Sequence, residues 1–287
     1  MTDPTAPTDS FPEVGRRMPL LEHLVELRVR VMRAAAGLVA GMVVSTFVVD
    51  YIFAALTAPL RLSMPHAGGD HPDVDAWYRA VIGPLADIAS ETQVKGTLAI
   101  TSTPLDGMYT WFRLAIVGGV LLASPLVAWQ IWQFIAPALY KNERRAVYPL
   151  VIGSTALFLS GAAFAYFFIL PVAFPIFFGI IQVDAVLSVS GYLTLVTRMM
   201  MVFGACFQLP VVTWFLARLG FIDHKDMMGA FRYAVVIIFL VAAIVTPPDV
   251  LTQTLLAIPL IVLYGVGIVV AYFTSTKVRA DGVSAAP

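Results

Sequence analysis

The first side chains able to do chemistry are carboxylates in a charged segment that precedes a long apolar run. Within residues 18–30, Glu22, Glu26 and Arg30 fall on one stripe at helical spacing, and leucines fall on another. This pattern predicts an amphipathic helix lying at a membrane surface. Glu26 can accept hydrogen bonds from a basic partner, or it can pair with Arg30 four residues later, which stabilises a helix by about 0.2–0.5 kcal/mol.

A second charged segment, residues 134–145, contains one carboxylate among three basic residues. Pro137 ends the preceding apolar helix, so Glu143 falls in a short loop and Phe134 falls at the level of the lipid headgroups beside it. The basic residues are explained as determinants of membrane topology. Glu143 is not explained in this way, and it is either a solvated loop carboxylate or a binding group.

Polar side chains inside apolar segments are costly in a membrane and are therefore candidate functional groups. Gln208 lies in the middle of one segment, just before Pro210, and its amide can bond to a neighbouring helix or to a partner protein. Asp249 and Gln253 are four residues apart and share a face at the start of the last apolar segment, where Asp249 can also act as an N-cap. Arg198 falls within the fourth apolar segment and is expected to extend toward the membrane interface.

Motifs for catalysis, cofactors and metals are missing from the sequence. There is no glycine-rich nucleotide loop, and the four histidines are scattered over predicted loops without the spacing of metal ligands. Cys206 is the only cysteine, which excludes an internal disulfide and a cysteine-based metal cluster. Lysine plus arginine equals aspartate plus glutamate at 18 each, so no net charge favours nucleic acid. We therefore expect a protein that is not an enzyme and that binds no cofactor, metal or nucleic acid.

The composition predicts that these residues are held by an all-α membrane domain. Hydrophobic residues make up 59% of the 287 residues and charged residues 13%, and the mean hydropathy is +0.85. Soluble domains, by contrast, are about a quarter charged. A helix needs about 20 apolar residues to cross the hydrocarbon core. Six segments meet or approach this length: 31–54, 112–135, 148–170, 193–216, 233–245 and 251–273.

The remaining segments complete a six-helix membrane domain at residues 18–275. Residues 1–17 are predicted to form a flexible N-terminus, residues 276–287 a tail, and residues 57–111 a polar external loop. Most lysines and arginines fall on one side of the membrane, so the positive-inside rule places both termini in the cytoplasm.

The fifth apolar segment, 233–245, is unusually short. Its 13 residues span about 20 Å as a helix, which is less than the thickness of the hydrocarbon core. Pro247 and Pro248 follow it and must turn the chain. Either this helix is truly short, or its boundary lies further out than the hydropathy pattern indicates.

Six short motifs occur along the chain: Leu20–Arg28, Ala58–Leu60, Gln133–Arg145, Ala163–Phe167, Phe207–Pro210 and Thr246–Pro259. Together, and in this order, they resemble the TatC family, the largest subunit of the twin-arginine protein translocase. The resemblance covers residues 19–273. It implies a concave, glove-like bundle of six helices with both termini in the cytoplasm, in which the last two helices are short.

The resemblance also implies roles for individual residues. In this family the cytoplasmic lead-in and the first cytoplasmic loop bind the paired arginines of export signals. Carried over by motif, Glu26 and Glu143 are the expected acceptors, and Arg28 and Phe134 are expected to shape the site. The chemistry suits this role, because a guanidinium offers a fixed fork of donors and an ammonium only a point charge.

Four further residues match motif positions away from the signal site. Gln208 occupies a position that is often glutamate in the family, on the concave face toward partner subunits. Pro59, Asp249 and Gln253 match positions near the outer side, where the resemblance implies structural or partner-docking roles.

We therefore expect the core subunit of a twin-arginine translocation system in the bacterial inner (cytoplasmic) membrane. It would bind signal peptides of folded proteins, associate with itself, and assemble TatB-like and TatA-like single-span subunits for export driven by the proton-motive force. The alternative is a secondary transporter or ion-coupled channel, in which Gln208, Asp249 and Gln253 line a solute path. That alternative gives no role to Glu26 or Glu143.

Overall fold

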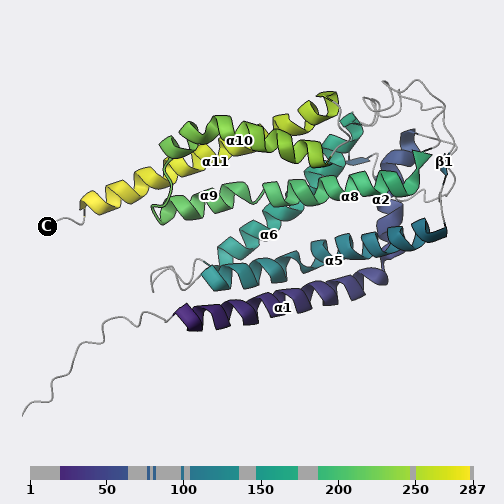
Figure 1. Ribbon diagram of the computed structural model, residues 1–287, viewed down its shortest axis with the longest axis horizontal. Coiled ribbons are helices and arrows are strands. Elements are labelled where there is room, and N and C mark those ends of the chain that lie inside the picture. The colour runs from purple at the N-terminus through teal and green to yellow at the C-terminus, as the bar shows by residue number, and fades with distance from the viewer. Residues whose placement is uncertain are drawn as a thin grey trace, which may run out of the picture.

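The computed structural model in Figure 1 is an elongated bundle of helices that run roughly side by side. It describes residues 20–63, 76–77, 80–81, 98–99, 104–135, 147–173, 187–245 and 250–284. Its main helices are α1 (Leu20–Thr46), α2 (Val49–Ser63), α5 (Pro104–Ile135), α6 (Val147–Phe164), α8 (Val189–Cys206), α9 (Leu209–Arg218), α10 (His224–Val245) and α11 (Val250–Ser284). A π-helical segment, η3 (Ala165–Ile169), continues α6, and two-residue strands β1 (Leu98–Ala99) and β2 (Leu187–Ser188) pair in parallel.

The described helices confirm a multi-span membrane protein that is almost entirely α-helical. Five helical segments in the described part of the chain are long and apolar enough to cross a bilayer: Leu105–Ile135, Tyr148–Ala173, Val189–Arg218, His224–Val245 and Gln253–Ser275. A sixth span is obtained when α1 and α2 are counted together as one bent pair.

The first predicted span, 31–54, is wrong in its second half because the helix breaks there. α1 ends at Thr46, α2 begins at Val49, and the two helices are bent by 80°. At the break, Phe47 and Val48 donate their backbone N–H groups to carbonyls three residues earlier, which tightens the last turn. The apolar pattern runs through the break without interruption, so hydropathy alone shows one helix.

The predicted external loop, 57–111, is helical at both ends. α2 continues to Ser63, and α5 begins at Pro104. In Figure 1 α2 runs across the end of the bundle where β1 lies, and we call this end the β end. The opposite end, where α1 begins at Leu20, is called the α1 end. Ala58 and Leu60 of α2 are fully buried at the β end, which explains why this segment folds as a helix against the bundle.

The last two spans are the shortest of the five described spans. They contain 22 and 23 residues, against 26 to 31 in the other three described spans. The helix predicted at 233–245 is nevertheless longer than the 13 residues expected. α10 begins at His224 rather than Tyr233, so it is about 33 Å long and can cross the hydrocarbon core. The hydropathy pattern missed its first turns because they carry Lys225, Asp226 and Arg232.

Helices α1 and α5 pack in close antiparallel contact along their length (Figure 1). A side chain at Gly119 of α5 would lie 2.7 Å from the backbone of Met42, and one at Gly41 would lie 2.6 Å from the carbonyl oxygen of Gly119. Small residues therefore bring the two backbones together, as is common between membrane helices. This packing positions the start of α1 against the end of α5.

Candidate functional site

Glu26 lies on the first turns of α1 and pairs within its own helix. Arg30 donates from Nε at 3.0 Å and from Nη2 at 2.5 Å, and both bonds go to Oε1 of Glu26. The Glu26 side chain is 25% exposed. Its second oxygen, Oε2, accepts no hydrogen bond within the described residues, so half of the carboxylate remains able to accept from another group.

Phe134 and Arg28 lie at the same end of the bundle as Glu26. Gly37 of α1 faces Leu126 of α5, and the two helices are antiparallel (Figure 1). Phe134 follows Leu126 by eight residues, about 12 Å along α5, and Arg30 precedes Gly37 by seven residues along α1. Because the helices are antiparallel, Phe134 lies level with the turn that contains Arg30. Phe134 is half-buried and Arg28 is exposed. Glu143, the second expected acceptor, lies outside the described residues.

The turn between α9 and α10 adds a charged cluster at the α1 end. The Asp223 carboxylate accepts from the backbone N–H of His224 at 2.7 Å, and the Asp223 N–H donates to the Asp226 carboxylate at 2.9 Å, which together cap α10. A hydrogen bond from Ser275, and further ones from His224, hold the pKa of the Asp223 carboxyl below its usual value against the opposing effect of desolvation. The cluster therefore ties the start of α10 to α11.

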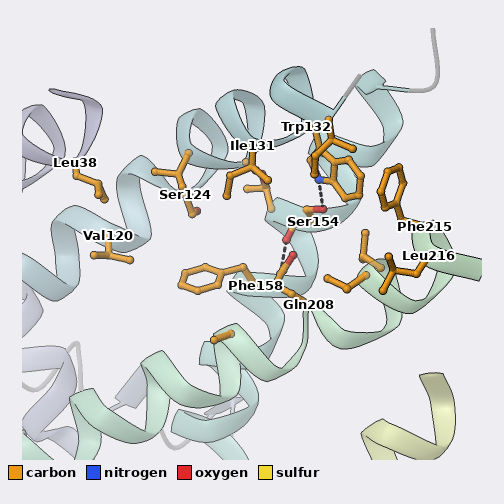
Figure 2. Close-up of a pocket in the computed structure, with 17 residues that line it drawn as sticks. Leu38, Val120, Ser124, Ile131, Trp132, Ser154, Phe158, Gln208, Phe215 and Leu216 are labelled. Atoms are coloured by element: carbon orange, nitrogen blue, oxygen red, sulfur yellow. Dashed lines mark hydrogen bonds between the residues drawn. The ribbon is translucent and has the colours of Figure 1, made fainter. Parts of the chain in front are cut away.

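Gln208 is held in the middle of the bundle by α6 (Figure 2). Its Nε2 donates to the backbone carbonyl of Ser154 at 2.9 Å, and the hydroxyl of Ser154 accepts from Nε1 of Trp132 at 2.7 Å. A carbonyl oxygen can only accept, so it fixes the amide nitrogen of Gln208 on the Ser154 side. The amide oxygen of Gln208 is therefore the atom left for a further partner.

These residues line an apolar cavity of about 640 Å³ between α5, α6, α8 and α9. Figure 2 shows Phe158 and Ile131 on its walls, and Phe215 near the Trp132 side. The hydroxyl of Thr155 also lines the cavity and is buried without a hydrogen-bond partner in the described structure. Trp132, Ser154 and Thr155 were not predicted from the sequence, because one indole and two hydroxyl side chains within apolar helices have no distinctive spacing.

Gln253 is satisfied within the protein rather than directed to a solute path. Its Nε2 donates to the backbone carbonyl of Phe239 in α10 at 2.9 Å, so it joins the last two helices near the β end. Asp249, its predicted neighbour on the same face, lies outside the described residues.

Pro59 is buried inside α2 and has a structural consequence. A proline inside a helix lacks an N–H group, so the carbonyl four residues earlier, that of Ala55, loses its helical partner. The hydroxyl of Tyr166, in the π-helical segment η3, donates to that carbonyl, and the hydroxyl of Tyr192 donates to the carbonyl of Leu56 at 2.7 Å. Pro59 thus creates the acceptor that fastens α2 across the β end.

The structure therefore separates the predicted residues into three places. Glu26, Arg28 and Phe134 lie at the α1 end, Gln208 lies on the cavity wall, and Pro59 lies at the β end. Known proteins with similar sequences and folds identify the family. The chain matches the family model described as Sec-independent protein translocase protein (TatC) over residues 22–259. The chain belongs to the TatC family.

Relatives and solved structures agree with this assignment. The TatC protein of Desulforapulum autotrophicum is 33% identical over 272 residues, which cover 94% of this chain and 90% of that protein. The TatC protein of Aquifex aeolicus is 32% identical, covering 91% of this chain and 97% of that protein. A crystal structure of the twin-arginine translocase receptor TatC superposes with a TM-score of 0.70 at 32% identity, over 87% of this chain and 97% of that one.

Membership of a protein translocase family replaces the alternative of a solute transporter or ion-coupled channel. A second TatC structure, in the detergent DDM, gives a TM-score of 0.71 at 31% identity over 87% of this chain. The TatC resemblance and the expected all-α fold with five to six membrane-spanning helices are thus confirmed, and the orientation of the termini stays a prediction.

Proposed function

We propose that this chain is the signal-peptide receptor and assembly platform of a twin-arginine translocase. The observation that carries the proposal is its membership of TatC, together with structural matches to proteins described as the twin-arginine translocase receptor. In this role it binds the signal peptides of folded proteins and gathers TatB-like and TatA-like single-span subunits and further copies of itself. The protein performs no chemical conversion, and the proton-motive force drives transport.

The α1 end is the proposed signal-binding surface. Oε2 of Glu26 accepts one guanidinium of the arginine pair, and Glu143 accepts the other, with Phe134 and Arg28 shaping the contact. The existing Arg30 bond supports this arrangement because it holds the Glu26 carboxylate in one position before the signal arrives.

Energetics limit what the two carboxylates contribute. A shielded charge-assisted hydrogen bond contributes about 1.5–3 kcal/mol, and an exposed ion pair contributes less than about 1 kcal/mol. A micromolar complex needs about 8 kcal/mol. The carboxylates therefore select arginine, and the apolar part of the signal must supply the remaining affinity by burial along the bundle.

The cavity around Gln208 is the proposed contact for a single-span partner. The amide oxygen of Gln208 is an acceptor in an apolar surrounding, so it favours a partner helix that presents a hydrogen-bond donor at this depth. The family resemblance implies that this position is often glutamate, and the amide oxygen of Gln208 keeps an acceptor there while removing the charge. Partner docking at the β end is proposed for Gln253 and Pro59, which already support helix contacts there. For Asp249 the same role rests on the sequence motif alone.

The proposed location is the bacterial inner membrane with both termini in the cytoplasm. The basic residues Arg28 and Arg30 in the first half of α1, with Arg218 and Lys225 near the α9–α10 turn, lie toward the α1 end. The positive-inside rule then places the α1 end in the cytoplasm, where signal peptides are first exposed.

Export in cells that lack their own TatC tests the proposal. The full chain, with its matching partner subunits, should export a folded reporter that carries a twin-arginine signal, and Glu26→Gln should reduce export at least about tenfold because a carboxylate acceptor is lost. Asp50→Asn, an exposed carboxylate of α2 at the opposite end, is the matched control and should export normally. Equal export by Glu26→Gln and wild type would contradict the role of Glu26, and export of a twin-lysine reporter at the same rate would contradict the receptor function.

A further inference from the structure

Arg198 is an exposed arginine on a membrane-spanning helix that the proposed function does not use. It is exposed on α8 and makes no hydrogen bond or ion pair within the described residues. The span Val189–Arg218 has 30 residues and is about 45 Å long, about 15 Å more than the hydrocarbon core. Arg198 therefore lies roughly one turn inside the hydrocarbon edge at the β end, within reach of the lipid headgroups for a long flexible side chain.

Arg113 of α5 places a second guanidinium beside the first turns of α8, on the β-end side of Arg198. Its Nη1 donates to the backbone carbonyl of Ser190 at 3.2 Å and to the hydroxyl of Thr194. Arg198 follows Thr194 by four residues, so their side chains are neighbours on the surface of α8. Two guanidiniums thus lie within about two helical turns of each other toward the β end, and within the described residues neither forms an ion pair with a carboxylate.

Two described carboxylates lie at this end, Asp50 and, in the first turn of α5, Asp106, and neither forms an ion pair with the two arginines. Asp50 of α2 lines a cleft of about 170 Å³ together with Trp111 and Val189, which are close in the chain to Arg113 and Ser190. Within the described residues the two arginines therefore have no carboxylate partner, and an unpaired charge near the edge of the hydrocarbon core favours the binding of an anion.

An apolar path leads away from Arg198 along α8. Ala205 follows Arg198 by seven residues and lies on the same face of α8, Val212 continues the path on α9, and all three side chains are exposed. Ala205 and Val212 also line the apolar cavity that contains Gln208. The distance from Arg198 to Ala205 is about 10 Å along the helix, which lies within the length of an acyl chain. A headgroup at Arg198 would therefore place its chains on this path.

We propose that Arg198 and Arg113 bind the phosphate of an anionic phospholipid at the β end, with an acyl chain lying along α8 toward the cavity. Two guanidiniums offer several donors in fixed planes to the phosphate oxygens, and their two positive charges favour a headgroup with net negative charge over a zwitterionic one. The acyl chain covers the exposed Ala205 and Val212. This inference does not depend on the proposed export function.

Lipid titration followed by native mass spectrometry of the intact, detergent-purified protein tests the site. Wild type should bind phosphatidylglycerol at least about tenfold more tightly than phosphatidylcholine, and Arg198→Gln should remove most of that preference, because the bidentate donor is lost. Arg198→Lys should keep part of it, since an ammonium retains the charge without the fork. Arg198 is exposed and bonds to no described residue, so the variants are expected to fold.

Arg232→Gln is the matched control. Arg232 is also an exposed membrane-helix arginine, but it lies over the ring of its neighbour Tyr233 toward the α1 end, and its loss should leave phosphatidylglycerol binding unchanged. Equal loss in both variants would indicate a general charge effect and overturn the site. Competition by soluble glycerol phosphate would show a free-phosphate site instead of a lipid site. If Arg198→Gln leaves lipid binding unchanged but abolishes co-purification of a single-span subunit, the anion is a partner's carboxylate and the lipid assignment is wrong.

Discussion

At the scale of single residues, most of the polar groups inside this bundle bond to backbone carbonyls. Gln208 and Gln253 each donate an amide nitrogen to a carbonyl on a neighbouring helix. Both glutamines therefore join helices, and each retains an oxygen that can accept from another group. Ser154 is the central residue of this pattern, because its carbonyl orients Gln208 and its hydroxyl accepts from Trp132.

Replacement of Ser154 by alanine should destabilise the protein. The variant leaves the buried Nε1–H of Trp132 without an acceptor, which costs about 1–3 kcal/mol. Denaturant unfolding in detergent, followed by tryptophan fluorescence, measures the change. Ser160→Ala on the same helix removes an exposed hydroxyl that bonds only to the carbonyl of Leu157, so it should unfold like wild type. Equal stability of the two variants would contradict the role given to Ser154.

The Asp223 cluster should make part of the stability depend on pH. The carboxyl has a lowered pKa in the folded protein relative to the ordinary value of 3.8, so its contribution is complete above about pH 4 and is lost as the pH falls through the lowered value. Asp223→Asn should therefore be less stable than wild type at neutral pH, and the difference should shrink below pH 3.8. Thermal unfolding at pH 7 and pH 3 checks this. A difference that stays constant over this range would show that the carboxylate charge is not involved.

At the scale of helices, breaks and close approaches shape the bundle more than hydropathy does. The bend of 80° between α1 and α2 turns α2 across the β end. There Pro59 exposes a carbonyl that Tyr166 satisfies from the π-helical segment η3. π-helical segments are rare, and those that occur are often found at functional sites. In this protein the π-helical segment brings the Tyr166 hydroxyl to an acceptor on α2.

Loss of the Tyr166 hydroxyl should loosen α2. In Tyr166→Phe the carbonyl of Ala55 has neither its helical donor nor the hydroxyl, which costs about 1–3 kcal/mol for a buried group. Hydrogen exchange of α2 amides and the midpoint of thermal unfolding measure this effect. Tyr148→Phe is the control on the same span, because Tyr148 is exposed. Unchanged protection of α2 in Tyr166→Phe would contradict the role given to the hydrogen bond between Tyr166 and the Ala55 carbonyl.

Two glycines on different helices should respond to alanine in opposite directions. At Gly119 an added Cβ would lie 2.7 Å from the backbone of Met42, so Gly119→Ala should push α1 from α5 and destabilise the protein by about 1–3 kcal/mol. At Gly153 of α6 nothing lies within 4 Å, so Gly153→Ala should stabilise the helix by up to about 1 kcal/mol. Unfolding midpoints of both variants test this contrast, which fails if the two shifts have the same sign.

At the scale of the whole molecule, the sequence was sufficient for the class of fold and for the family but not for the connections between helices. Long apolar segments identified the spans, because crossing a bilayer requires them. Hydropathy did not show the bend after Thr46, because the apolar pattern continues across it. It also did not show the first turns of α10, because these turns contain charged residues. Polar contacts such as Gln208 to Ser154 depend on which helices become neighbours, which a single sequence does not state.

The three sites lie at different depths of the same bundle. Glu26 and Phe134 occupy the α1 end, Gln208 lies on the cavity wall, and Arg113 and Arg198 lie toward the β end. A signal peptide that places its arginines at the α1 end can extend its apolar segment along the bundle without displacing the contacts at the β end. This separation allows signal binding and lipid binding to be measured independently.

Binding of a twin-arginine signal peptide to the purified protein tests the central claim most directly. Fluorescence anisotropy of a labelled peptide should show a micromolar complex, and the twin-lysine peptide should bind at least about tenfold more weakly, because ammonium groups lack the forked donor geometry. Glu26→Gln should remove this preference and Asp50→Asn should keep it. Equal affinity for the two peptides, unchanged by Glu26→Gln, would contradict the account of this chain as the receptor.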